Sequence, residues 1–215
     1  MQYIKGLDAF DGRNHTAVTL GKFDGLHRGH QKLLNRIMKY AQKEDCDSVV
    51  CAFDMDRDCL MTNEERRAFL EDKVDYLIEI PFTREMMEME AEKFIDEILH
   101  KKLHASHIVV GTDFNFGHEK RGNHQMLEKY AAKYGYTVDV VEKAYYKDRE
   151  ISSTYIRELL LDGNVPLANE LLGYPYEITS VVEHGQQLGR TLGFPTMNLA
   201  PQEKKILPKY GVYAC

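Results

Sequence analysis

The sequence lacks several features that mark particular classes of protein. Its 215 residues contain no apolar run near the ~18 residues that a membrane-spanning helix needs. The opening residues, MQYIKGLDAFDGRNH, are too polar for a secretory signal peptide. The four cysteines form no CxxC pair, so neither a zinc knuckle nor a redox motif is indicated. Lys and Arg number 28 against 34 Asp and Glu, and a net charge of −6 argues against a general nucleic-acid binder. We therefore expect a cytoplasmic protein without nucleic-acid or membrane partners.

What is present, over the first three quarters of the chain, is an alternation of short apolar runs and amphipathic stretches. The runs are mostly Val/Ile-rich with little polar alternation, as in strands covered on both faces. They predict strands at 17–20, 48–53, 76–80, 107–111 and 137–142. Helical periodicity predicts helices at 30–43, about 62–72, 90–102 and 124–134. This alternation predicts an α/β fold with a parallel sheet.

The pattern changes after residue 142. Residues 153–162 are predicted to form a helix that ends at Gly163, and Asn164 caps a second short helix that ends at Gly173. From Tyr176 onward the sequence is typical of strands and turns. We place a boundary near Gly173, which divides the chain into domains 1–172 and 173–215.

The sharpest motif is GKFDGLHRGH at residues 21–30, between the first predicted strand and the first predicted helix. Its glycines let the backbone approach a ligand, and free N–H groups at a helix start favour an anion. His27 and His30 are three apart, so both rings lie on one side of the first turn. A cationic or hydrogen-bonding pair there suits charge that builds up on a phosphoryl group. Half of a zinc site, or two surface histidines beside a structural turn, are the alternatives.

This strand–GxFDGxHxGH–helix unit resembles the nucleotidyltransferase signature of the bacterial bifunctional riboflavin kinase/FMN adenylyltransferase (FAD synthetase) family. Three further segments match that family in order: Phe53-Asp54, GTDFNFG at 111–117 and ISSTYIR at 151–157. The resemblance implies a Rossmann-like nucleotidyltransferase domain that transfers AMP from ATP to FMN, giving FAD and pyrophosphate. It also implies Mg²⁺ as a cofactor that accompanies ATP.

The resemblance assigns a role to each matched position. The expected catalytic residues are His27, His30 and Arg157. The expected ATP-binding residues are Gly21, Lys22, Phe23, Asp24, Gly29, Ser153 and Thr154. The expected flavin-binding residues are Phe53, Asp113, Asn115 and Phe116. No direct protein ligand to a metal is expected in the first domain.

Two of these motifs also have plainer interpretations. The ISSTYIR segment can be a second anion site, in which Ser152 or Ser153 caps the helix and Arg157 lies one turn further on. It can equally be an ordinary Ser-capped amphipathic helix with a solvated Arg. The GTDFNFG segment can be a tight turn with two core aromatics.

Two positions depart from the family pattern. Lys22 stands where the family usually carries Asn, and as a point charge it can still bind phosphate. The segment from Met55 to Asp58 replaces a Pro-His-Pro segment that shapes the flavin pocket in the family, so we expect it to change flavin affinity or ring placement. The alternatives to FAD synthesis are transfer to another acceptor, or a flavin- or nucleotide-binding module without turnover.

The last segment resembles the start of the family's riboflavin kinase barrel. Its GFPTMN turn contains Thr196 and Asn198, which in that domain bind Mg-ATP, and we interpret them here as a remnant without function. The family's catalytic Glu and most of its barrel would follow the last residue. We therefore expect an incomplete antiparallel β-barrel, no kinase activity, and self-association through the open edge of the barrel.

Overall fold

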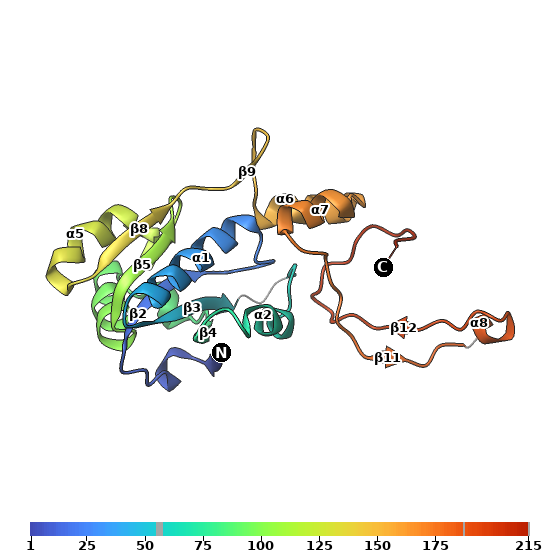
Figure 1. Cartoon of the computed structure of the whole chain (residues 1–215), viewed down its shortest axis with the longest axis horizontal. Helices are drawn as coiled ribbons and strands as arrows, with labels where there is room; N and C mark the ends of the chain where they lie inside the picture. Colours follow the sequence, from blue (N-terminus) through green and yellow to red (C-terminus); the bar gives the residue numbers. More distant parts are fainter. Residues whose placement is uncertain (55–57, 187, 215) are drawn as a thin grey trace.

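A computed structural model describes residues 1–54, 58–186 and 188–214. A parallel sheet of six strands lies at its centre, in the order β1-β4-β3-β2-β5-β8 (Figure 1). These strands are β1 (Gln2–Lys5), β2 (His15–Gly21), β3 (Cys46–Asp54), β4 (Tyr76–Pro81), β5 (Ala105–Gly111) and β8 (Thr137–Val141). After β2 the chain adds β3 and β4 on one side of that strand, and it then adds β5 and β8 on the other side. In open parallel sheets, ligands bind outside the carboxyl ends of the strands at such a reversal.

Helices connect the strands, and several begin and end at the residues that the sequence marks. The longer ones are α1 (Arg28–Lys43), α2 (Asn63–Leu70), α5 (His124–Tyr134), α6 (Ser153–Asp162), α7 (Val165–Leu172) and the π-helical segment η2 (Phe94–Lys102). Thr62 and Glu65 form a reciprocal capping box at the start of α2. Gly135, Gly163 and Gly173 end α5, α6 and α7 in the left-handed conformation.

The structure also contains shorter helices and strands. They are η1 (Leu7–Ala9), α3 (Arg84–Glu88), α4 (Ala91–Lys93), η3 (His118–Lys120), α8 (Leu188–Thr191), and the paired strands β6 (Asn115–Phe116) with β7 (Gly122–Asn123), β9 (Tyr145–Tyr146) with β10 (Arg149–Glu150), and β11 (Val182–Glu183) with β12 (Asn198–Leu199).

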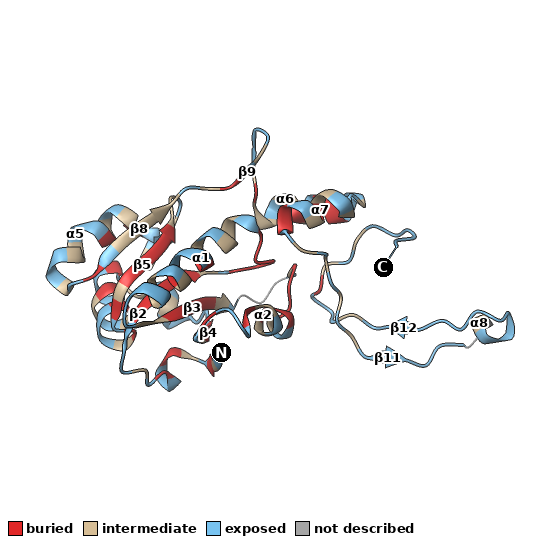
Figure 2. Cartoon of the chain, in the orientation of Figure 1, coloured by how far each residue is buried: buried red, intermediate tan, exposed pale blue. Residues whose placement is uncertain are grey.

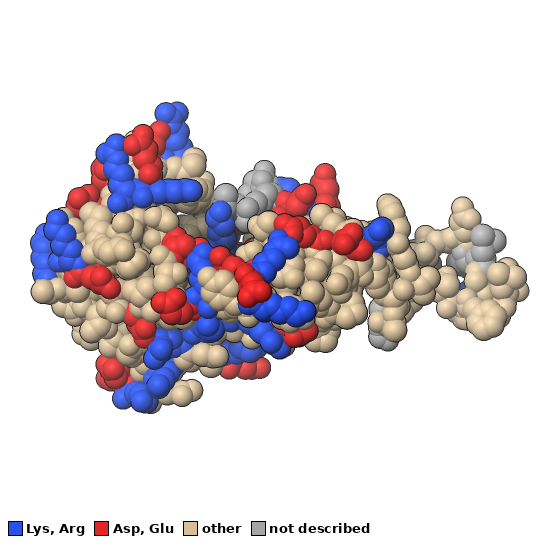
Figure 3. Space-filling model, turned by 90° about the horizontal axis from the view of Figure 1, so that it is seen from above, with Lys and Arg blue, Asp and Glu red and all other residues tan. Residues whose placement is uncertain are grey.

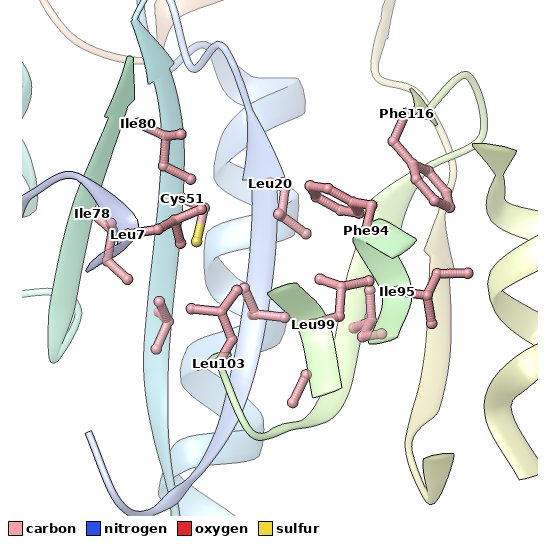
Figure 4. Close-up of a cluster of buried hydrophobic side chains, with 14 of the residues drawn as sticks. Leu7, Leu20, Cys51, Ile78, Ile80, Phe94, Ile95, Leu99, Leu103 and Phe116 are labelled. Atoms are coloured by element: carbon pink, nitrogen blue, oxygen red, sulfur yellow. The ribbon is translucent and has the colours of Figure 1, made fainter. Parts of the chain in front are cut away.

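Both faces of the sheet are buried, because successive apolar residues of each strand point to opposite sides. On one face, Leu20, Cys51 and Ile78 of three neighbouring strands pack with Phe94 and Leu99 of η2 (Figure 4). A second cluster contains Ala17, Val50, Leu77 and Val109 from the strands with residues of α1 and α2. The four inner strands β2, β3, β4 and β5 are accordingly the most continuously buried part of the molecule (Figure 2).

The last forty residues are built differently. After α7 the chain runs out into a projecting hairpin that carries β11, α8 and β12, and then returns toward the body (Figure 1). The hairpin is exposed along almost its whole length, and large apolar side chains such as Phe194 and Met197 are among the exposed residues (Figure 2). Charged side chains cover the body but are sparse on this projecting part in the view of Figure 3.

The α/β prediction with a Rossmann-like parallel sheet is confirmed, and the small antiparallel ladders are consistent with a partial barrel. Each predicted strand is present to within a few residues, as are the predicted helices, with 90–102 divided between α4 and η2. The sequence interpretation missed β1, which pairs with β4 at the edge of the sheet, and α3. The division at residues 172 and 173 stays a prediction. Within the described parts of the chain, no helix is long and apolar enough to cross a membrane.

Candidate active site

The loop between β2 and α1 has a strained backbone. Phe23 and Leu26 are not glycines, yet they have φ angles of 47° and 36°. Both side chains are fully buried, and this packing holds the unfavourable conformation in place. Glycine is favoured at position 25 for two reasons. Its φ angle is 82°, which other residues rarely adopt, and a Cβ there would lie 2.9 Å from Cδ1 of Leu60. The loop therefore packs closely against Leu60, and it connects the carboxyl end of β2 to the N-terminus of α1.

The two histidines of the loop form a stacked pair. Their ring centroids are 3.8 Å apart with 23° between the planes. His27 is the N-cap of α1, and its Nδ1 accepts a hydrogen bond from the backbone N–H of His30 at 3.4 Å. Gly29 leaves room for this stack, because a Cβ there would lie 3.1 Å from the His27 ring. The expectation that both rings lie on one side of the first turn is confirmed.

Burial keeps both rings neutral. It lowers the pKa of His27 to about 4. Burial also lowers the pKa of His30, and the neighbouring His27 adds to that effect. Nδ1 of His30 is buried and has no hydrogen-bond partner among the described residues. Of the two interpretations left open by the sequence, burial therefore favours the hydrogen-bonding pair over the cationic one.

The second predicted anion site, at the start of α6, contacts the first directly. Ser152 is the N-cap and accepts from the N–H of Tyr155 at 3.2 Å. Ser153 donates its hydroxyl proton to the backbone oxygen of Asp24 at 2.8 Å. Arg157, one turn on, is ion-paired with the carboxylate of Asp24. The solvated Arg of the plainer interpretation is therefore not what the structure shows.

The N-termini of α1 and α6 open onto one cavity of about 390 Å³. Its lining includes Lys22, His27, Gly29, His30, Gly111, Asp113, Lys143, Ser153, Thr154 and Arg157. Two helix N-termini point their unpaired N–H groups and positive dipole ends into the same space, and basic side chains stand beside them. The cavity lies at the reversal between β2 and β5, since Gly111 ends β5. The two helix N-termini favour an anion there, although Asp113, Glu142 and Glu150 also line the cavity.

A second cavity of about 640 Å³ lies beyond the carboxyl ends of β3 and β4. Its lining includes Lys22, Asp24, Phe53, Asp54, Cys59, Arg66, Arg67 and Phe82. Phe53 and Phe82 meet edge to face at 5.7 Å. Lys22 lines both cavities, so a ligand in one can meet a ligand in the other beside its side chain.

The larger cavity has a buried charged wall that the sequence interpretation did not anticipate. Arg66 and Arg67 of α2 lie 3.2 Å and 3.6 Å from the carboxylate oxygens of Glu79 on β4. The hydroxyl of Tyr3 donates to Glu79 at 2.6 Å and accepts from Arg67 at 2.9 Å. A carboxylate on an otherwise apolar strand, YLIEIP, was the one available signal of this network.

The structure brings most of the predicted site residues together, though not all. His27, His30, Lys22, Gly29, Ser153, Thr154, Arg157 and Asp113 line the smaller cavity, while Phe53 and Asp24 line the larger one. Gly21 ends β2, and Phe23 packs edge-on against His30 at 5.3 Å.

The remaining predicted residues lie away from both cavities. Phe116 is buried in the core against Phe94, as the tight-turn interpretation of its motif expected, and exposed Asn115 donates its side-chain amide to the backbone oxygen of Asp113. Thr196 and Asn198 are exposed on the hairpin. Of the altered segment from Met55 to Asp58, residues 55–57 lie outside the described residues. Among the residues that are described, no group of three or more His, Cys, Asp or Glu side chains could hold a metal.

Comparison with known proteins agrees with the family resemblance of the sequence motifs. A family model of FAD synthetase matches residues 10–155, and one of riboflavin kinase matches residues 172–215. The chain is 35% identical to a bifunctional riboflavin kinase/FMN adenylyltransferase of Buchnera aphidicola, with 100% of this chain and 72% of that protein covered. It is 35% identical to the Escherichia coli protein of that name, with 92% and 66% covered. A crystal structure of a protein described as a macrolide-efflux protein from Streptococcus pneumoniae is similar too, with a TM-score of 0.87, 32% identity, and 99% of this chain and 72% of that one covered.

Proposed function

The chain belongs to the bifunctional riboflavin kinase/FMN adenylyltransferase family, and we propose that it makes FAD and pyrophosphate from FMN and ATP in the two cavities described above. The observation that carries this assignment is the smaller cavity, where two helix N-termini, the histidine pair and Arg157 converge. That arrangement fits the triphosphate of ATP. The larger cavity, with Phe53 and Phe82 at its wall, fits the flavin.

The reaction needs positioning and charge stabilisation rather than proton abstraction. The FMN phosphate is already an anion, and it attacks the α-phosphorus of ATP while pyrophosphate leaves in line. His27 and His30 stand where neutral N–H groups can donate to oxygens of the α-phosphoryl group as charge develops there. Lys22, at the junction of the cavities, neutralises charge between the two reacting phosphates.

The start of α6 holds the far end of ATP in this proposal. Ser153, Thr154 and Arg157 face the smaller cavity, where they can bind the β- and γ-phosphates that leave as pyrophosphate. Asp113 lines the same cavity and is paired with Lys143 at 3.0 Å. Flavin contacts of Asp113, Asn115 and Phe116 remain predictions, and the core position of Phe116 favours a structural role for that ring.

Mg²⁺ belongs to the proposal as a companion of ATP. A cation that is bound mainly by phosphate oxygens and water requires few protein ligands. When bound, Mg²⁺ would neutralise charge on the phosphate oxygens. The small-molecule partners are ATP, FMN, FAD and pyrophosphate, and the cytoplasm, where ATP is available, is the proposed location.

One assay separates this function from its alternatives. Protein, FMN, ATP and Mg²⁺ are incubated and the flavins are separated, and we expect FAD with an equal amount of pyrophosphate. FMN binding without turnover would instead indicate a binding module. Pyrophosphate release only with a different phosphorylated acceptor would indicate a nucleotidyltransferase with a remodelled pocket. Riboflavin run in parallel tests for kinase activity, and we expect no FMN, because Thr196 and Asn198 lie exposed on the hairpin.

The projecting hairpin carries a separate proposal of self-association. Val181, Leu192, Phe194 and Met197 are each at least 74% exposed, and β11 and β12 form only a two-residue ladder. Exposed apolar residues beside open strand edges favour pairing with another copy. Sedimentation velocity over a range of concentrations tests this, with a concentration-dependent dimer as the expected result and a monomer throughout as the contrary one.

A further inference from the structure

The segment after the hairpin returns toward the body of the molecule (Figure 1). There it pairs with the loop that precedes α2. The N–H of Cys59 donates to the oxygen of Lys204 at 2.8 Å, and the N–H of Ile206 donates to the oxygen of Cys59 at 3.0 Å. These two bonds make a parallel bridge between Cys59 and Lys205. Residues matched by the riboflavin kinase model thus contact a loop of the FAD synthetase part.

Lys205 anchors this contact from a buried position. Only 3% of its side chain is exposed, and lysine is almost never this buried unless it is paired. Its Nζ donates to Glu65 at 2.6 Å and to the backbone oxygen of Leu60 at 2.8 Å. It also lies 4.4 Å from the ring centre of Tyr176. The same oxygen of Glu65 accepts from the N–H of Thr62 in the capping box of α2.

The backbone of Leu60 links Lys205 to Asp24. Its carbonyl accepts from Lys205, while its N–H donates to the carboxylate of Asp24 at 2.7 Å. The other carboxylate oxygen of Asp24 is paired with Arg157, and Arg157 also donates to the backbone oxygen of Asp58 at 3.2 Å. A continuous series of polar contacts therefore runs from Lys205 to the guanidinium in the smaller cavity.

We propose that Lys205 is a positioning residue for adenylyl transfer, and that it holds the loop at Asp58–Leu60 so that Asp24 keeps Arg157 aimed at the phosphates of ATP. The proposal rests on the proposed function for its chemistry. It makes the segment after the hairpin a working part of the ATP site, although no residue of that segment lines the smaller cavity.

The test replaces Lys205 without leaving a buried charge behind. Lys205→Met alone would leave Glu65 buried and unpaired, which destabilises a fold. Combining it with Glu65→Gln removes both charges, and Gln at that position preserves the capping box. We expect the Kd for ATP and the KM for ATP to rise about tenfold, the size of effect that a coupled network typically shows. Lys205→Arg alone retains a cation and hydrogen-bond donors, so it should raise the Kd and the KM for ATP less than the double variant does.

A matched control and a second background make the result decisive. Lys209→Met changes an exposed lysine of the same segment and should leave the Kd and KM for ATP as in the wild type. In a protein that already carries Arg157→Ala, the Lys205→Met/Glu65→Gln change should alter the Kd for ATP by less than about twofold, because its effect passes through Arg157. An unchanged Kd in the wild-type background, or an equal tenfold rise in both backgrounds, would overturn the proposal. Equilibrium binding of ATP can be measured without turnover. A wild-type protein that binds ATP but makes no FAD would therefore contradict the proposed function and not the positioning role of Lys205.

Discussion

Arg157, on α6, is ion-paired with Asp24, which lies 133 positions earlier in the loop after β2. Asp24 lines the larger cavity and Arg157 the smaller one, so the pair stands in the wall between them. The two motifs that the sequence marks as separate anion sites therefore meet in one ionic contact. In the proposed function Asp24 orients Arg157, and a direct contact of Asp24 with ATP stays a prediction.

Removing one charge of this pair should cost stability and activity together. Asp24→Asn leaves the largely buried Arg157 without an anion, and we expect the free energy of unfolding to fall by about 3 kcal/mol. Asp24→Asn combined with Arg157→Met removes both charges and should recover much of that stability while FAD synthesis stays lost. Urea unfolding and the rate of FAD formation measure the two effects. An active double variant would contradict the role given to Arg157.

The histidine pair should be needed for chemistry and not for folding. His30→Ala removes a preorganised donor from the smaller cavity, and we expect the rate of FAD formation to fall by about 10²–10³ with the fold intact. His184→Ala, on the exposed hairpin, is the matched control and should retain the wild-type rate. Circular dichroism checks the fold of both variants. A near-normal rate in His30→Ala would remove the pair from the mechanism.

The low pKa of His27 should make the protein less stable in mild acid. An unfolded histidine titrates near pH 6.5, but the folded pKa is about 4, so the unfolded state binds more protons between these values. Stability from this group is therefore complete above pH 6.5 and is lost as the pH falls toward 4, by about 3 kcal/mol in total.

Comparison with a non-titrating cap isolates this effect from the carboxylates. His27→Asn keeps a good N-cap on α1 but cannot be protonated. Urea unfolding between pH 6.5 and 4 should show a shallower loss of stability in this variant than in the wild type. Parallel pH profiles of the two proteins would show that His27 is not held neutral by burial.

The two serines at the start of α6 should separate a structural role from a binding role. Ser152→Ala removes the N-cap and should lower the free energy of unfolding by about 1 kcal/mol with little change in the KM for ATP. Both serines line the smaller cavity, but the Ser152 hydroxyl oxygen is occupied by the N-cap, whereas the Ser153 hydroxyl bonds to the backbone oxygen of Asp24. We expect Ser153→Ala to raise the KM for ATP with a smaller effect on stability. The opposite assignment of the two effects would contradict the proposed phosphate contacts.

The sequence predicted the sheet well because its strands are buried on both faces and appear as short continuous apolar runs. Leu20, Cys51 and Ile78 are examples. β1 was missed because it is an edge strand of only four residues, and its pattern, QYIK, has no apolar run. The site loops were also predictable, since the spacing of His27 and His30 within a glycine-rich turn places both rings at one helix start.

What could not be predicted are contacts between distant positions. The Asp24–Arg157 pair and the Glu65–Lys205 pair, the latter 140 positions apart, depend on how the chain folds back on itself. A buried Arg66 looks, in sequence, like any charged residue of an amphipathic helix. Conversely, Phe116 belongs to a motif associated with the flavin, but three-dimensional packing assigns its ring to the core.

The central claim is that the FMN phosphate attacks the α-phosphorus of ATP in this protein. The most direct measurement uses ATP labelled at the α-phosphorus, incubated with FMN, Mg²⁺ and the wild-type protein, followed by separation of flavins and phosphates. We expect the label to appear in FAD, with one label per FAD formed, and the pyrophosphate to be unlabelled. Label that remains in ATP, or that enters a product other than FAD, would contradict this claim.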